Sequence, residues 1–436
     1  MLDIKFIKEN KDQVQKAIQN KKIKEKIDVD ELINLYDLAR ELEEKVVAIR
    51  TQQNKLTEGI KMSKDEDDRN GLIQQATSLK EELRTLEKEG NEARGKFDAM
   101  LLQVPNVTSP EMPVGQSDAE NVVIRKWGKP KEFVFEVKDH VELGERLGLI
   151  DIENGSKVSG SRFYYLRGDA VLLQFAIINF VFETLTNKET IAKIANEAGS
   201  PYSNPFIPML PPVMIKPEIM KKMDRLDPIE ERYALKDDDL VLVGSAEHTM
   251  GPIHMDETMD IERLPIRYIG YSTAFRREAG SYGQDVRGIL RVHQFDKLEM
   301  ETYVPKEDGE TEQKFIVALQ EYMMQKLEIP YQVIQICTGD TGKPDYNQFD
   351  IESWIPSQGK YRETHTSDYM TDYQARRLNI KYKTKDGEKE FAHMNDATAF
   401  AMSRILIAIL ENYQQENGSI QIPKVLQKYV GKEFIN

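Results

Sequence analysis

The chain has 436 residues, 40% of them hydrophobic and 31% charged, with a formal net charge of −14. This length exceeds the range in which one hydrophobic core keeps growing, so we expect two or more domains; the acidic balance argues against a protein that coats nucleic acid non-specifically. A single cysteine, Cys337, excludes an internal disulfide and a multi-cysteine zinc site, and no signal peptide or run of roughly 20 apolar residues is present, so a cytoplasmic protein without a membrane span is expected.

The first 100 residues have the pattern of long helices. No proline occurs between Lys26 and Pro105. Two series of mostly apolar residues, spaced by alternating steps of four and three, flank a polar break at residues 65–71. The first series is Leu35, Ala39, Leu42, Val46, Ile49, Gln53, Leu56 and Ile60, and the second is Leu72, Ala76, Leu79, Leu83, Leu86, Gly90, Ala93 and Phe97. Such a 3.5-residue repeat keeps one seam facing a partner helix.

The two series predict an antiparallel helical hairpin that forms an arm over residues 1–104. Each helix has about four heptads, which is roughly 40 Å at 1.5 Å per residue. A dimerisation coiled coil would use the same seams. The matched lengths and the short polar break favour an intramolecular hairpin instead.

A second domain of the α+β class is predicted after a linker at residues 105–127. From residue 128 to 436, runs of β-branched and aromatic residues alternate with helical stretches. Strands are expected at residues 240–247, 266–278, 288–304, 332–337 and 349–356. Several connections are short, so the sheet should be largely antiparallel and flanked by helices.

Polar chemistry concentrates between Tyr268 and Glu301, on two of these strands and the glycine-rich loop predicted between Glu278 and Gly288. Strand alternation places Arg276 and Glu278 on one face of the first strand. On the second strand, one face carries Arg291, His293, Phe295, Lys297 and Glu299. A solvent-exposed polar face is the structural alternative. An aromatic ring between guanidinium and carboxylate groups favours a site for a purine base beside a phosphate chain.

These strands also carry a family resemblance. FRREAG followed by RGILRVHQFDKLE resembles the second signature motif of class II aminoacyl-tRNA synthetases, in its seryl form. Further matching segments are KVSGSRFYYLRGDA, LPP, FDIESWIPSQ, TDYQARR and RILIAILENYQ. Together with the hairpin they make nearly the whole chain similar to seryl-tRNA synthetases of the bacterial type, with an N-terminal coiled-coil arm.

The resemblance implies a ligase with two ATP-driven steps. L-serine and ATP would give seryl-adenylate and pyrophosphate, and serine would then pass to the 3′ end of tRNA-Ser, with tRNA-Sec as a further acceptor. It also implies Mg²⁺ with ATP, no zinc, and a homodimer formed through the region of Pro212. The alternatives are activation of threonine, a carrier-protein acceptor, and a scaffold without catalytic activity.

The resemblance further implies a role for the arm, which in this family reaches the long variable arm of the tRNA. Recognition of an RNA backbone by scattered cations is physically reasonable. The candidate contacts are Lys45, Arg50, Lys55, Lys80 and Arg84.

The resemblance also assigns site residues. The catalytic residues would be Arg276, Glu363 and Arg404. Serine would be bound by Ser245, Ala246, Glu247, Arg276, Glu299 and Thr398. ATP would be bound by Arg276, Arg277, Glu278, Phe295, Glu363, Thr364, His365, Thr366 and Arg404. Mg²⁺ would be held by Glu363 and Thr366, whose oxygen atoms are ligands that this ion prefers.

Five positions depart from the commonest pattern of the family: Ser245, His248, His365, Asp368 and Asp396. Ser245 replaces a threonine, and one methyl group discriminates between substrates by only about 1–3 kcal/mol. Threonine therefore stays an alternative substrate. Serine is favoured because the two carboxylates and the threonine hydroxyl assigned to its binding are retained.

Overall fold

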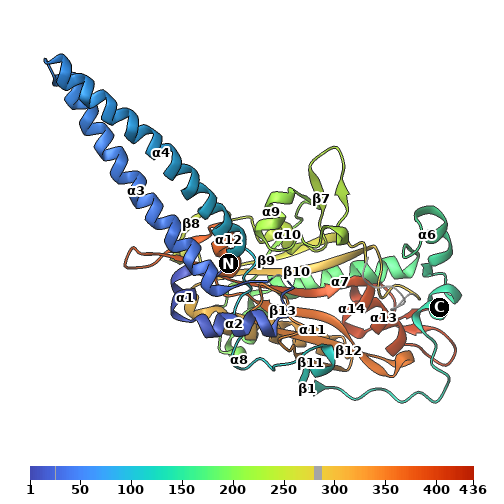
Figure 1. The fold of residues 1–436 in the computed structure, drawn as a ribbon. Coiled ribbons are helices and arrows are strands. Elements are labelled where there is room, and N and C mark those ends of the chain that lie inside the picture. Colours follow the sequence, from blue (N-terminus) through green and yellow to red (C-terminus); the bar gives the residue numbers. More distant parts are fainter. Residues whose placement is uncertain (25, 279–286) are drawn as a thin grey trace. The chain divides into compact units, whose positions relative to one another are not determined.

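The computed structural model describes residues 1–24, 26–278 and 287–436. They form two compact units, Met1–Val107 and Thr108–Asn436. The first unit is helical (Figure 1), with α1 at Ile4–Glu9, α2 at Lys11–Asn20, α3 at Val29–Met62 and α4 at Glu66–Leu101.

The turn between α3 and α4 is shorter than the predicted polar break. The Asp65 carboxylate accepts hydrogen bonds from the backbone N–H groups of Asp67 and Asp68 at 2.9 and 3.0 Å. It satisfies amide groups that have no partner within the helix, so α4 begins at Glu66. Residues 66–71 are therefore helical, and only residues 63–65 form the turn.

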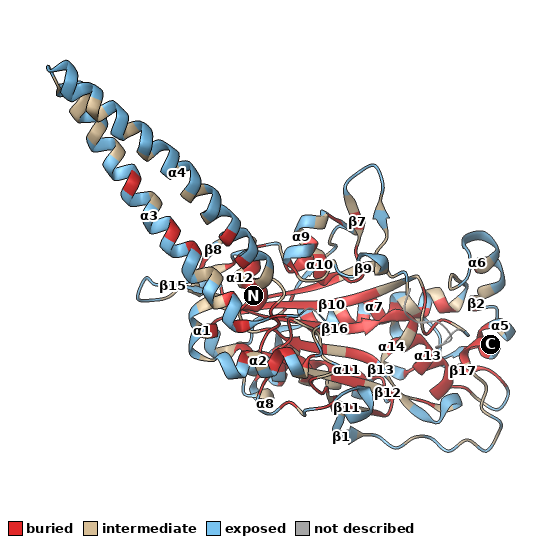
Figure 2. Cartoon of the chain, in the orientation of Figure 1, coloured by how far each residue is buried: buried red, intermediate tan, exposed pale blue. Residues whose placement is uncertain are grey.

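The heptad seam holds α3 and α4 together. Every seam position predicted from the sequence is buried or half-buried. Ala39, Leu42 and Ile49 on α3 are buried, as are Ala93 and Phe97 on α4 (Figure 2). Each helix thus covers the other's apolar face, and the predicted intramolecular hairpin is confirmed.

The second unit is built on an eight-stranded sheet, ordered β1-β11-β12-β13-β16-β10-β9-β4. The strands span Val122–Trp127, Tyr331–Gln335, Asn347–Ile355, Lys360–Tyr369, His393–Ala401, Gln294–Val304, Ile266–Phe275 and Ile207–Met209, in that order. All neighbouring pairs are antiparallel except β4 with β9. The predicted α+β class with a largely antiparallel sheet is confirmed.

Three helices cover one face of this sheet: α7 at Asp169–Thr186, α11 at Gly309–Lys326 and α13 at Met402–Asn412. Among the described residues, α7 alone is long and apolar enough to cross a membrane, and half of it is buried. Leu173, Ile177 and Val181 lie in the main hydrophobic core with no exposed surface. It is therefore a core helix.

The remaining elements of the second unit are short. The helices are α5 at His140–Arg146, α6 at Ile152–Ser159, α8 at Lys188–Ala198, α9 at Pro217–Lys222, α10 at Glu247–Met250, α12 at Tyr373–Leu378 and α14 at Lys424–Val430. The strands are β2 at Ile150–Asp151, β3 at Tyr165–Leu166, β5 at Met214–Ile215, β6 at Ala234–Leu235, β7 at Leu240–Leu242, β8 at Thr258–Asp260, β14 at Lys381–Lys383, β15 at Lys389–Phe391, β17 at Ile420–Gln421 and β18 at Phe434–Ile435.

Three predicted strands have different ends in the structure. The strand expected at 240–247 stops at Leu242, and Glu247 begins α10. The strand expected at 266–278 stops at Phe275, and Glu278 has a φ of 52°, a left-handed conformation that no strand residue adopts. The strand expected at 288–304 begins at Gln294. Residues 279–286 of the predicted glycine-rich loop lie outside the described residues.

Four strands of the sheet, β1, β4, β13 and β16, were not expected. β13 and β16 are rich in charged residues, asparagine and alanine, which have low strand propensity, although all of β16 is buried. β1 lies within the range predicted to be a linker and pairs with β11 at the edge of the sheet. Tertiary packing outweighs local propensity at these positions.

Candidate active site

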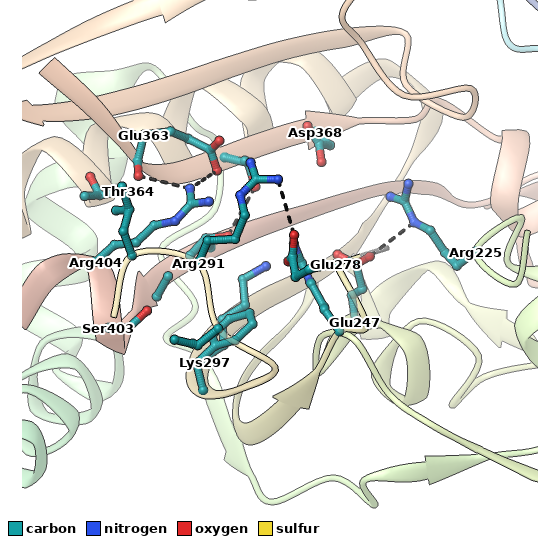
Figure 3. A pocket seen from close by; sticks show the side chains of 17 residues that line it. Arg225, Glu247, Glu278, Arg291, Lys297, Glu363, Thr364, Asp368, Ser403 and Arg404 are labelled. Carbon is teal, nitrogen blue, oxygen red and sulfur yellow. Dashed lines mark hydrogen bonds and ion pairs between the residues drawn. The ribbon is translucent and has the colours of Figure 1, made fainter. Parts of the chain in front are cut away.

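A cavity lies beside the central strands of the sheet (Figure 3). Side chains from the ends of β9 and β10, from β13 and β16, and from the start of α13 line it. The predicted site residues that line it are Glu247, Arg276, Glu278, Phe295, Glu363, Thr364, Thr366, Thr398 and Arg404. Residues from distant parts of the sequence thus converge on one cavity.

One end of the cavity, here called the arginine end, carries Arg276, Arg291, Arg404 and Phe295. Nη1 of Arg404 lies 2.6 Å from Oε1 of Glu363 (Figure 3). The guanidinium carbon of Arg276 lies 5.4 Å from the centre of the Phe295 ring. Three guanidinium groups at one end of a cavity, one of them beside an aromatic ring, suit a planar base that carries a chain of negative charge.

The arginine end is held by specific contacts. Arg276 Nε donates a hydrogen bond to the carbonyl oxygen of Gly244 at 3.1 Å. Nη1 of Arg291 lies 3.3 Å from Oε2 of Glu278. Burial alone would raise the pKa of the Glu363 carboxyl, but the charges of Arg404 and Arg276 outweigh burial and lower it. Glu363 is therefore an ionised carboxylate at neutral pH.

The other end, here called the acidic end, carries Glu247, Asp368, Thr398 and Arg225. Nε of Arg225 lies 3.1 Å from Oε1 of Glu247 (Figure 3). Thr398 places its hydroxyl oxygen 3.2 Å from that of Thr366. The two ends of the cavity thus differ in the sign of the groups that dominate them.

A buried layer supports the acidic end. Glu299 has no exposed surface, and its Oε2 lies 2.7 Å from Nζ of Lys297. The Ser245 hydroxyl donates a hydrogen bond to the same carboxylate at 3.2 Å, and the Thr398 hydroxyl donates another at 3.5 Å. Neither Ser245 nor Glu299 lines the cavity. The structure places both behind Thr398 and Lys297, which do line it.

The structure explains the unusual histidine at position 248. Its Nδ1 accepts a hydrogen bond from the backbone N–H of Gly244 at 3.1 Å, so the proton of the neutral ring is on Nε2. Burial lowers the pKa of His248 to about 4, which keeps the ring neutral at pH 7. Nε2 lies 3.4 Å from Oε1 of Glu247. His248 therefore helps to orient the Glu247 carboxylate.

The acidic end has more carboxyl groups than cations. Oxygen atoms of Glu247, Glu299 and Asp396 lie within 4.8 Å of one another, with Arg225 and Lys297 as the neighbouring cations. Burial alone would raise the pKa of Glu247, but Arg225 and then His248 outweigh burial and hold it well below its usual range. Burial and then mutual repulsion raise the pKa of Asp396. An additional positive charge that enters the cavity here would be stabilised.

Two more acids near this end, Glu301 and Asp368, also have raised pKa values. Burial is the main cause of the raised pKa of Glu301 and of Asp368, and neighbouring carboxylates add to it. Both oxygen atoms of Glu301 are buried without a hydrogen-bond partner. A group that leaves water without a partner favours its neutral form, so burial shifts the Glu301 carboxyl toward its protonated form.

Besides Ser245 and Glu299, three more predicted site residues do not line the cavity. Ala246 is fully buried in a small apolar cluster beside α10. Arg277 is exposed, and its backbone N–H donates to the carbonyl oxygen of Glu231. The His365 ring is buried with its centre 4.8 Å from that of Phe400 in the core. Burial lowers the pKa of His365 to about 3, so it is a neutral core residue.

Sequence reasoning missed five polar residues that line the cavity: Arg225, Arg291, Lys297, Asp368 and Ser403. Arg291 and Lys297 had a signal, because strand alternation placed them in the charged row with Phe295. Asp368 was noted only as a departure from the family pattern. Arg225 follows a short helix and has no periodicity or motif that marks it.

The predicted Mg²⁺ ligands can be tested against the cavity. Glu363 and Thr366 both line it, and they offer a carboxylate and a hydroxyl, the hard oxygen donors that Mg²⁺ prefers. The Glu363 carboxylate is ionised beside Arg404. The donor set therefore fits the ion. Thr364 also lines the cavity, but its hydroxyl is engaged with that of Ser353 at 2.8 Å.

Comparison with known proteins identifies the family. Residues 1–108 match the seryl-tRNA synthetase N-terminal domain, and residues 231–413 match the tRNA synthetase class II core domain (G, H, P, S and T). A serine–tRNA ligase of Dictyoglomus turgidum is 42% identical over 434 residues, which cover 99% of this chain and 98% of that protein. The chain belongs to the seryl-tRNA synthetase family. The resemblance inferred from its motifs is thereby confirmed.

Solved structures of this seryl-tRNA synthetase family agree with the fold. The crystal structure of seryl-tRNA synthetase from Pyrococcus horikoshii complexed with ATP superposes with a TM-score of 0.88 at 36% identity, covering 100% of this chain and 99% of that chain. The cytoplasmic serine–tRNA ligase from Naegleria fowleri in complex with AMP gives 0.84 at 28% identity, with the same coverage. The chain is thus a class II aminoacyl-tRNA synthetase, and synthetases of this class use ATP with a divalent metal ion.

Proposed function

We propose that the chain activates L-serine with ATP and then transfers the seryl group to the 3′ end of tRNA-Ser. The observation that carries this proposal is the polarity of one cavity. Its arginine end suits a nucleotide and its acidic end suits an amino acid, and the two meet along β10. Along this strand, Phe295 lies at the arginine end, and Lys297 and Glu299 follow toward the acidic end.

At the arginine end, Phe295 would stack on the adenine ring. Arg276 and Arg404 would contact the phosphates, and Glu363 with Thr366 would hold Mg²⁺, which supplies charge neutralisation when bound. The first step is attack of the serine carboxylate on the α-phosphorus, with pyrophosphate as the leaving group. Arg276 would stabilise the negative charge that develops on the phosphate oxygens, without taking or giving a proton.

At the acidic end, the Glu247 carboxylate would bind the α-ammonium group of serine. The Thr398 hydroxyl, supported by Glu299, would contact the serine hydroxyl. The hydrogen bond between the Glu247 carboxylate and the ammonium group would be charge-assisted, and such bonds are about twice as strong as neutral ones. A substrate without the hydroxyl, such as alanine, would leave these buried polar groups unpaired, which costs free energy.

The position of Ser245 supports serine rather than threonine as the substrate. The side chain is 1% exposed and is bonded to Glu299 and Lys297. A threonine residue at position 245 would therefore place its additional methyl group outside the cavity. The serine residue found there does not enlarge the space beside the side chain of the substrate.

The arm, residues 1–104, would bind the tRNA, and residues 128–436 would act as the catalytic domain. Of the predicted linker at residues 105–127, the last six form β1 of the catalytic sheet. All five predicted contact residues are exposed. Lys45 pairs with Glu41 along α3, and Arg50 pairs with Glu87 across the hairpin at 2.8 Å. Arg50 therefore forms an ion pair within the arm, although its side chain is exposed to solvent.

We propose tRNA-Sec as a further acceptor of serine, and we place the activity in the cytoplasm.

We also propose a homodimer formed by the second unit. The parallel edge strand β4 and the neighbouring helix α7 expose large apolar side chains: Leu172, Phe175, Ile207 and Leu210. An exposed apolar patch of this kind marks a protein contact. Pro212 lies beside it and is exposed. Sedimentation of the wild type and of Phe175→Asp would test the dimer, which the added charge should dissociate.

ATP–pyrophosphate exchange across a panel of amino acids, followed by charging of tRNA-Ser, tests the activity. Exchange with serine and formation of seryl-tRNA are expected. Exchange with threonine but not with serine would contradict the substrate, and absence of exchange with every amino acid would favour a scaffold. Adenylation with serine but without tRNA charging would favour a different acceptor.

A further inference from the structure

Arg225 has a fixed place in the fold. It follows α9, and its backbone N–H donates to the carbonyl oxygen of Met220 at 3.1 Å. Nε and Nη2 of Arg232 donate to the backbone carbonyl oxygen of Arg225 at 3.0 and 2.7 Å. These contacts hold the backbone, so the side chain enters the acidic end of the cavity from a defined origin. Only 16% of the side chain is exposed.

The guanidinium group joins three segments that are far apart in the sequence. Nε lies 3.1 Å from Oε1 of Glu247 on α10. Nη2 donates a hydrogen bond to Oδ2 of Asp396 on β16 at 3.1 Å, and it lies 4.0 Å from Oδ1 of Asp345, just before β12. Burial alone would lower the pKa of Arg225, but the three carboxylates outweigh burial and raise it. Arg225 is a permanent cation at the centre of this network.

The network controls which atom of Glu247 faces a ligand. Arg225 and His248 both meet the same oxygen, Oε1, at 3.1 and 3.4 Å. Oε1 is thereby engaged by an ion pair with Arg225 and by the His248 ring, and we assign the other oxygen, Oε2, to the ammonium group. A rigid arginine fork suits this task, because its donors have a fixed planar arrangement.

We propose that Arg225 is a positioning residue of the amino-acid subsite, which fixes the Glu247 carboxylate in the orientation that binds the α-ammonium group of serine. Asp396 and Asp345 hold the guanidinium group in place. This inference rests on the proposed function, in which Glu247 binds that ammonium group. Arg225 itself transfers no proton and touches no phosphate.

A purely structural role for Arg225 would be neutralisation of Asp396. The two roles differ in what they require. Neutralisation is no longer needed when Asp396 becomes asparagine, which keeps the shape of the side chain and removes its charge. Positioning of Glu247 is still needed in that background.

The test is ATP–pyrophosphate exchange with the full chain, measured against serine and against ATP. The variants are Arg225→Met, Arg225→Lys, Asp396→Asn and the double variant Arg225→Met/Asp396→Asn. Arg263→Met is the matched control, because Arg263 is exposed, pairs with Glu257 and does not line the cavity.

The KM for serine should rise at least about tenfold in Arg225→Met, as expected when a charge-assisted contact to the substrate is misaligned. The KM for ATP should stay within about twofold of the wild type, because the arginine end is unchanged. The KM for serine of Arg225→Lys should lie between those of the wild type and of Arg225→Met, since lysine keeps the positive charge but lacks the planar guanidinium group. The double variant should be as impaired as Arg225→Met, and the control should match the wild type.

An unchanged KM for serine in Arg225→Met would overturn the inference. So would parallel increases in both KM values, which indicate general loss of structure, or recovery of the wild-type KM in the double variant, which indicates neutralisation alone. If Arg225→Met does not fold, the comparison of Arg225→Lys with the wild type and the double variant carries the same test. Failure of the wild type to exchange with serine would instead contradict the proposed function.

Discussion

The arm and the catalytic unit are organised in opposite ways. In the arm, each contact between α3 and α4 repeats the one before it, because a single heptad pattern continues along both helices. In the catalytic unit, the cavity is assembled from β9, β10, β13, β16, α10 and α13, and from the irregular segment that carries Arg225. A repeat makes a long surface, whereas convergence of distant segments makes a site.

The two regions also differ in how they use charge. The arm's ion pairs, such as Arg50 with Glu87, are exposed to solvent and are worth at most about 1 kcal/mol each. The ion pairs at the acidic end of the cavity are largely buried, and removal of one partner from such a pair is strongly destabilising because it leaves an uncompensated charge. Charge in the arm is therefore available to a partner, and charge at the acidic end of the cavity is held in a fixed arrangement by its buried neighbours.

The largest effect is expected from Arg276→Ala. Loss of a preorganised cation beside the reacting phosphate should reduce serine-dependent ATP–pyrophosphate exchange by about 10³-fold or more. Binding of tRNA, measured by filter retention, should be unchanged because the arm is intact. Arg277→Ala is the control, since this neighbouring side chain is exposed and outside the cavity. An equal loss in both variants would contradict the assignment.

Deletion of residues 30–96, which removes most of the hairpin, should have the reverse effect. Charging of tRNA-Ser should fall by about 100-fold or more at low tRNA concentration, because the backbone contacts of the arm are lost. Exchange with serine should stay within about threefold of the wild type. Loss of exchange in the truncated protein would show that the two units are not functionally separable.

Acid should affect the catalytic unit and not the arm. All six histidines lie beyond residue 128, and burial lowers the pKa of His393 from its ordinary 6.5 to about 4. The unfolded chain therefore binds a proton more readily than the folded one between these values. The stability that the neutral ring provides is complete above pH 6.5 and is lost as the pH falls toward 4.

His393→Gln should reduce this loss. Between pH 7.5 and pH 5, the free energy of unfolding of the wild type should fall by up to about 2 kcal/mol more than that of the variant. Denaturation followed by tryptophan fluorescence reports on the catalytic unit alone, because Trp127 and Trp354 both belong to it. Equal pH dependence of the two proteins would contradict a buried neutral His393.

The smallest effect is expected from Arg50→Ala in the arm. Loss of one phosphate contact should weaken tRNA binding a few-fold and reduce the slope of log Kd against log salt concentration by about 1. Glu87→Ala removes the same ion pair but keeps the cation, so its tRNA affinity should not fall. The same reduction in both variants would show that the ion pair, and not the contact of Arg50 with RNA, supports binding.

The sequence by itself determined the arm and part of the catalytic site. The spacing of Leu42, Ile49, Ala93 and Phe97 predicted the seam because helical neighbours are set by local periodicity. The motif around Arg276 and the alternation of Phe295 and Lys297 predicted one wall of the cavity for a similar reason. The left-handed Glu278 and the polar, fully buried strand β16 had no such local signal, so the ends and the number of strands were misjudged.

Only the tertiary structure decided which residues surround the amino acid. Arg225, Asp345 and Asp396 form one network although up to 171 positions separate them in the sequence. His248 orients Glu247, whereas His365, which the resemblance assigned to ATP binding although it departs from the family pattern, lies in the core. Periodicity specifies which face of a helix or strand is buried, but contacts between irregular segments depend on how the whole chain folds, and no local pattern encodes them.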